Sequence, residues 1–176
     1  MKKLIVIALL ILPTLAMAKR NKRRVMSKNS VVQDRVSANL NSVTGSSTVI
    51  GLSGGYLLKP KIKLVGGLLL FSGVTYFEVG GAYVHKLGRG LELTGGGVIA
   101  TATLAGASGS GIYAFATIDK RLSKELQLTG KVALGSGGIR LGGEGQYFFT
   151  KQFGGSLLLS TGDSVTYLTI AGNYYF

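Results

Sequence analysis

The last residues of the chain alternate between two kinds of side chain and finish on an aromatic ring. Leu168, Ile170, Gly172, Tyr174 and Phe176 all fall on one face of this segment. A period of two residues is the pattern of a β-strand whose two faces meet different surroundings. Because an apolar face that ends in an aromatic residue suits the last, lipid-facing strand of a membrane barrel, the segment predicts strands that cross a membrane.

The first residues have the order of a secretory leader. Two lysines precede an apolar run at residues 4–12, Pro13 breaks the run, and small residues follow at 16–18. This order predicts a signal peptide over residues 1–18 that is cleaved after Ala18. A membrane-anchoring helix is the alternative, although the run is shorter than the roughly 20 residues that a bilayer span requires.

The composition excludes several classes of protein. Cysteine is absent, which removes disulfide frameworks, thiolate metal sites and cysteine nucleophiles. Glycine supplies 28 of 176 residues, and it sits inside alternating runs such as 95–97 and 142–143. Glycine in a strand marks a bend or a close approach of the backbone, and a small barrel needs both. No later segment is apolar over the 18 or so residues of a helical span, so any span must be made of strands.

Turn residues divide the chain into pieces long enough to cross hydrocarbon as tilted strands. We expect strands over residues 47–58, 61–71, 74–86, 91–103, 111–119, 125–135, 138–149, 152–160 and 164–176. Among the connections on the outer side of the membrane, we expect only residues 104–110 to form a long loop.

One hairpin is predicted residue by residue. If Ser136 and Gly137 form a two-residue turn, one face carries only apolar residues and glycines, in the pairs Leu134–Ile139, Val132–Leu141, Gly130–Gly143, Leu128–Gly145 and Leu126–Tyr147. The opposite face is mainly polar, and it places Lys131 diagonal to Glu144, within reach of long side chains. A soluble sandwich would show the same division with the faces exchanged.

In its leader, its alternating segments and its aromatic end, the chain resembles the small outer-membrane β-barrel proteins of Gram-negative bacteria, over roughly residues 47–176. The resemblance implies an all-β fold, an antiparallel up-and-down transmembrane β-barrel in the outer membrane. It also implies two partners, the lipid bilayer and the outer-membrane assembly machinery, for which Phe176 would be the assembly signal.

The number of strands follows from topology. A chain that starts and ends on the periplasmic side crosses the membrane an even number of times. The segments above number nine, so one strand is missing or one is spurious. Residues 30–43 are the obvious tenth strand, because Val36, Ala38 and Leu40 partly alternate with polar residues. Ten strands are favoured. Eight strands with an irregular or helical amino-terminal region are the alternative, so residues 30–46 are either strand or helix.

Several charged residues are predicted to face the barrel interior. Segment 74–86 separates Phe77, Val79 and Tyr83 from Tyr76, Glu78 and Lys86, whereas 61–71 is apolar on both faces and cannot be oriented. A buried carboxylate needs a cation or hydrogen-bond donors, and Lys63 is one inward candidate. The predicted interior polar network is Glu78, Glu92, Lys131, Arg140 and Glu144.

Residues 19–29 form a basic segment without any acid. Its six cations are Lys19, Arg20, Lys22, Arg23, Arg24 and Lys28. Such a block is usually a solvated, disordered tail. The alternative is contact with anionic lipid headgroups, lipopolysaccharide or another polyanion, at roughly 1 kcal/mol per basic residue. We expect no nucleic acid, because export separates the chain from it despite a net charge of +13.

No catalytic, cofactor or metal constellation emerges from the sequence. His85 is the only histidine, and its parity places it on the outer face. We therefore predict a non-enzymatic barrel that contributes to envelope integrity or surface contacts, with an interior plugged by side chains. A narrow channel or transport-related barrel is the first alternative, and a lipid-modifying outer-membrane enzyme is the second.

Overall fold

Ten strands make up the computed structural model, which describes residues 34–43, 48–71, 73–104, 107–136, 138–162 and 165–176. They are β1 (Arg35–Val43), β2 (Val49–Lys59), β3 (Ile62–Phe71), β4 (Val74–Gly88), β5 (Leu91–Leu104), β6 (Ala107–Arg121), β7 (Leu126–Gly135), β8 (Gly138–Phe148), β9 (Phe153–Gly162) and β10 (Val165–Tyr175).

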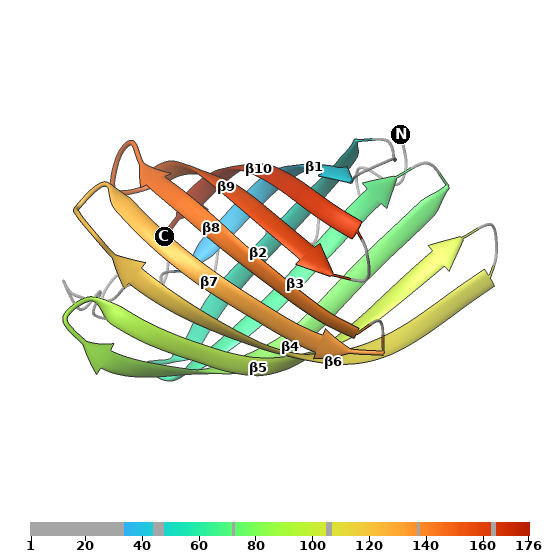
Figure 1. The fold of residues 1–176 in the computed structure, drawn as a ribbon, viewed down its shortest axis with the longest axis horizontal. Coiled ribbons are helices and arrows are strands. Elements are labelled where there is room, and N and C mark those ends of the chain that lie inside the picture. The colour runs from blue at the N-terminus through green and yellow to red at the C-terminus, as the bar shows by residue number, and fades with distance from the viewer. Residues whose placement is uncertain (1–33, 44–47, 72, 105–106, 137, 163–164) are drawn as a thin grey trace. The chain divides into compact units, whose positions relative to one another are not determined.

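The strands follow one another around a closed barrel in chain order (Figure 1). All neighbours are antiparallel, and β1 closes the wall against β10, where Arg35 pairs with Tyr175. The ten-strand antiparallel barrel predicted from the sequence is confirmed, and the eight-strand alternative is wrong. No helix in the described ranges is long and apolar enough to cross a membrane.

The strand β1 forms because its residues alternate in polarity. Ser37 and Asn39 are buried, whereas Ala38 and Leu40 are exposed on the outer surface. A helix would scatter these residues around its axis, while a strand places all the polar ones on the lumenal face. Pairing with both β10 and β2 then completes the wall.

The barrel is apolar outside and polar inside. Large apolar side chains such as Leu128 and Ile170 are exposed, while their polar neighbours in the chain, such as Thr129, face inward and are buried. This arrangement matches a barrel whose outer band meets lipid. His85 lies on the exposed outer face, as its parity predicts.

The predicted β7–β8 hairpin is confirmed pair by pair, from Leu126 opposite Tyr147 to Gly135 opposite Gly138. The predicted loop over residues 104–110 is wrong. Leu104 pairs with Ala107, so 107–110 begin β6 instead. The small residues of this stretch carry little conformational preference of their own, and pairing with β5 extends the ladder through them.

Two glycines allow a close approach of the β4 and β5 backbones. A Cβ atom on Gly80 would collide with the carbonyl oxygen of Gly97 and lie 2.8 Å from the Cα atom of Val98. A Cβ atom on Gly96 would collide in the same way with the carbonyl oxygen of Gly81. The two backbones therefore approach each other at a distance that only glycine permits.

Some predictions lie outside the described residues. These are the signal peptide over residues 1–18, with its cleavage after Ala18, and the basic tail over 19–29 with its six cations. Phe176 is described, and it follows the last residue of β10, Tyr175.

Candidate functional site

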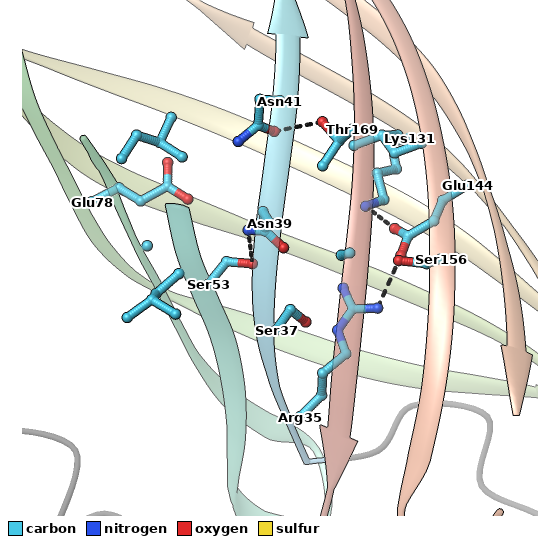
Figure 2. Close-up of a pocket in the computed structure, with 15 residues that line it drawn as sticks. Arg35, Ser37, Asn39, Asn41, Ser53, Glu78, Lys131, Glu144, Ser156 and Thr169 are labelled. Carbon is cyan, nitrogen blue, oxygen red and sulfur yellow. Dashed lines mark hydrogen bonds and ion pairs between the residues drawn. The ribbon is translucent and has the colours of Figure 1, made fainter. Parts of the chain in front are cut away.

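A polar cavity of about 180 Å³ lies inside the barrel. Figure 2 shows Glu78 on one side of it and Lys131 with Glu144 on the other, with side chains of β1 between them. The cavity exists because several inward positions carry small residues, among them Gly67 and Ser156. Side chains therefore leave part of the lumen unfilled at this level.

The positive side of the cavity is an ion triad. Glu144 Oε1 lies 3.0 Å from Arg35 Nη1, and Glu144 Oε2 pairs with Lys131 Nζ. The Glu144 side chain is only 4% exposed, while Arg35 and Lys131 are partly open to the lumen. Since β10 and β9 separate β1 from β8, the Arg35 contact reaches across the lumen, and the triad has one cation in excess.

The negative side of the cavity is the Glu78 carboxylate. It accepts hydrogen bonds from the hydroxyl groups of Tyr76, at 3.1 Å, and Tyr113. No ion pair to Glu78 is formed within the described ranges. Gly67 is its cross-strand partner, and a Cβ atom there would lie 2.8 Å from Glu78 Oε1, so the glycine makes room for the carboxylate.

Hydroxyl and amide groups line the wall between these two sides. Asn39 Nδ2 donates to Ser53 Oγ at 2.8 Å, and Thr169 Oγ1 donates to Asn41 Oδ1 at 2.6 Å. Ser37 also lines the cavity and is 2% exposed, yet its hydroxyl has no hydrogen-bond partner in the described part of the chain. A buried hydroxyl without a partner is costly, so a guest in the cavity would find a hydrogen-bonding group ready for it.

A packed group of side chains lies toward the end of the barrel where β1 begins and β10 ends, here called the terminal end. The Arg121 guanidinium stacks on the Phe148 ring, with 4.2 Å from Cζ to the ring centroid. Phe148 packs against Tyr175, and the Tyr175 hydroxyl donates to Gln146 Oε1 at 3.2 Å. These contacts form a packed group of bulky side chains in the lumen.

A second buried carboxylate, Asp119, has a structural role. It accepts hydrogen bonds from Thr117 at 2.9 Å, Thr129 at 2.6 Å and Gln127 at 3.3 Å. The strand predicted to end at residue 119 continues to Arg121, so Asp119 lies inside β6. The two donors on β7, Gln127 and Thr129, tie β6 to β7 on the lumenal side.

The five charged residues predicted to form one interior network all lie on lumenal positions, in several local groups. Lys131 contacts Glu144 directly. Glu92 is 2% exposed and lies 4.0 Å from Lys86 Nζ. The Arg140 guanidinium lies 5.5 Å from the centroid of the Tyr167 ring, and Glu78 is bound by the two tyrosines described above.

Near the terminal end, Asp34 and Lys63 form a further charged group. The Leu57 N–H donates to Asp34 Oδ1 at 2.5 Å. Burial raises the pKa of the Asp34 carboxyl, while this hydrogen bond and the nearby Lys63 act in the opposite direction. Asp34 therefore helps to anchor the start of β1 against β2.

Sequence reasoning missed Arg35 and Tyr113 as parts of the site. The signal for Arg35 was present, because Arg35, Ser37, Asn39 and Asn41 share one parity and are all polar. Val32, Val36 and Leu40 are spaced by four residues, which suits an amphipathic helix and kept a helix as the alternative to the favoured strand. The Tyr113 hydroxyl donates a hydrogen bond to Glu78, which lies 35 positions earlier in the chain. No local sequence pattern reveals such a contact.

A closed antiparallel barrel with an apolar exterior and a polar lumen has the fold of outer-membrane β-barrel proteins. The sequence itself matches no protein-family model and no curated protein. The solved KdgM porin aligns over 81% of this chain and 99% of its own length, with 12% identity and a TM-score of 0.55, and a second KdgM structure, in complex with disordered oligogalacturonate, gives the same values.

The COG4313 outer membrane channel from Pseudomonas putida F1 aligns over 86% of this chain and 99% of its own, with 10% identity and a TM-score of 0.56. At such low identity the likeness shows the fold alone.

Proposed function

We propose that this protein is a narrow, water-filled channel of the bacterial outer membrane that passes small hydrophilic solutes. The observation that carries the proposal is the polar cavity of about 180 Å³ inside a barrel with an apolar exterior. At roughly 30 Å³ per molecule, this cavity has room for on the order of six waters. The fold shared with a porin and an outer membrane channel supports the same proposal.

The charges of the lumen support passage of polar rather than apolar solutes. Arg35, Lys131, Glu144 and Glu78 all line the cavity. Charged groups that line a lumen hold water and lower the cost of moving another polar group past them. A solute must then pass the packed group around Phe148, which we infer to be the constriction.

A closed barrel that contributes to envelope integrity is the second candidate. The stacking of Arg121 on Phe148, and of Phe148 on Tyr175, favours it, because these contacts would block the lumen if they did not open. Both candidates are non-enzymatic, like the porin and the channel that share the fold.

The conductance of the refolded chain in a planar lipid bilayer distinguishes the two candidates. We expect small, steady single-channel steps for the wild-type protein and larger steps for Phe148→Ala, which would widen the constriction. Phe149→Ala is the matched control, because Phe149 is the next residue in the chain and is 68% exposed on the barrel exterior. A silent wild-type protein would overturn the channel and leave the closed envelope barrel.

We further propose the cellular setting of the channel. Residues 1–18 would direct the chain across the inner membrane and be cleaved off after Ala18, and the assembly machinery would read Phe176 when it inserts the barrel. The basic segment 19–29 would then contact anionic headgroups or lipopolysaccharide at the membrane surface.

A further inference from the structure

The cavity has two sides of opposite charge. Arg35 and Lys131 share the single carboxylate of Glu144, which leaves one positive charge in excess. Glu78 stands on the other side and is held by two tyrosine hydroxyls, without an ion-pair partner in the described ranges. Figure 2 shows the two groups facing each other across the side chains of Ser37, Asn39 and Asn41.

We propose that this cavity is a binding site for small zwitterions, solutes that carry one ammonium and one carboxylate, such as short amino acids. The ammonium would lie at Glu78, and the carboxylate at Arg35 and Lys131. This inference deepens the proposed channel function, since a solute that passes through the lumen would pass this site.

Charge complementarity selects this class over others. A lone anion at the triad would face the carboxylate of Glu78, and a lone cation at Glu78 would face the excess positive charge of the triad. A neutral polyol would gain hydrogen bonds without any charge-assisted one, and hydrogen bonds to charged groups are roughly twice as strong. A zwitterion satisfies both sides at once, without leaving net charge in the lumen.

The buried hydroxyl of Ser37 supplies the second observation. It lines the cavity and has no hydrogen-bond partner in the described part of the chain. Groups of this kind in a natural protein are normally satisfied by water or by a ligand. Ser37 is also two residues from Arg35 on the lumenal face of β1, so its hydroxyl is close to the place where the carboxylate would bind.

Binding can be measured without any conduction. We would titrate the refolded, isotope-labelled barrel in detergent with glycine, β-alanine and 4-aminobutyrate, and follow the backbone amide signals of the cavity-lining residues by NMR. Propionate, propylamine and glycerol are the comparison solutes, because they carry one negative charge, one positive charge and no charge, respectively. We expect saturable shifts for at least one zwitterion, and its length would report the separation of the two charged sides.

Two variants test the two sides. Glu78→Gln and Lys131→Gln should each weaken zwitterion binding on the order of tenfold, the size of one lost charge-assisted hydrogen bond. Glu125→Gln is the matched control, since it makes the same change as Glu78→Gln at an exposed turn between β6 and β7, and it should leave binding unchanged. Migration of the folded barrel on unheated gels checks that each variant is folded.

The outcomes separate this inference from the channel proposal. Equal binding of glycerol and the zwitterions, or no saturable binding at all, would overturn the zwitterion site even if the protein conducts. Saturable zwitterion binding that both lumenal variants weaken would support the site even if the wild-type protein is silent in a bilayer. If neither variant weakens zwitterion binding, the binding site lies elsewhere and the assignment is refuted.

Discussion

Lys131 and Glu144 form an ion pair across the diagonal of the β7–β8 hairpin, and the Glu144 carboxylate also reaches Arg35 on β1. This carboxylate thus connects two adjacent strands to a third on the far side of β9 and β10. Contacts of this kind brace a barrel from within, because each one fixes a distance across the lumen.

The first prediction concerns this brace. Lys131→Met and Glu144→Gln should be strongly non-additive, with a coupling of about 0.5–3 kcal/mol, because each substitution removes the same ion pair. The measurement is a double-mutant cycle of urea unfolding in lipid vesicles. Additive effects would show that the ion pair contributes nothing to the stability of the barrel.

Loss of the Glu144 charge should also change ion selectivity. Glu144→Gln leaves Arg35 and Lys131 with no carboxylate between them, so the lumen gains one unit of positive charge. We expect a shift of the reversal potential toward anions in a salt gradient across a planar bilayer. The shift should shrink at high salt, where the Debye length falls to about 3 Å at 1 M.

The orientation of the strands predicts which face tolerates charge. Ile170→Arg should cost about 2–4 kcal/mol if the residue lies near the membrane midplane, because it faces outward. Thr169→Arg should cost less, since this neighbouring residue lines the polar cavity. Unfolding titrations in lipid compare the two at nearly the same depth, and equal costs would contradict the assignment of the faces.

The close approach of the β4 and β5 backbones predicts different outcomes for adjacent glycines. Gly80→Ala should destabilise the barrel by about 1–3 kcal/mol, because the added methyl group would collide with the backbone of β5. Gly81→Ala is its control, since a Cβ atom there meets nothing within 4 Å. If urea unfolds both variants at the same concentration, the close approach of the backbones has no energetic importance.

The last residue should matter for assembly rather than for stability. A chain that ends at Tyr175 should reach the outer membrane in much smaller amounts, because it lacks the proposed signal, while refolding in lipid vesicles stays normal. Immunoblots of membrane fractions measure the first quantity and gel mobility measures the second. Normal amounts in the membrane would refute the role of Phe176.

The features of the fold that the sequence predicts correctly are those that depend on a strict alternation of apolar and polar residues. The lumenal position of Glu78 follows from alternation. The pairing of Leu126 with Tyr147 follows from alternation together with the predicted two-residue turn, because a one-residue slip would expose polar groups on the apolar face. Strand β3 could not be oriented, since Leu64 and Leu69 give both of its faces apolar residues.

The site was less accessible to sequence reasoning than the fold. Its contacts join residues far apart in the chain, as Arg35 and Glu144 do over 109 positions. Such a contact depends on the closure of the wall and on the small residues that leave the lumen open. Neither the cavity nor the partnership of Tyr113 with Glu78 has a local signature.

The start of β6 has one further consequence. Residues 107–110 pair with β5, whereas the pairing of β6 with β7 begins at Tyr113 opposite Gly135. At about 3.3 Å per residue, this stretch of β6 extends roughly 13 Å along the strand past the turn at Ser136. The rim of the barrel therefore steps down between β6 and β7, and the mouth is oblique. A large particle that approaches this mouth would touch the β5–β6 hairpin first, while small solutes could enter sideways over the lower rim.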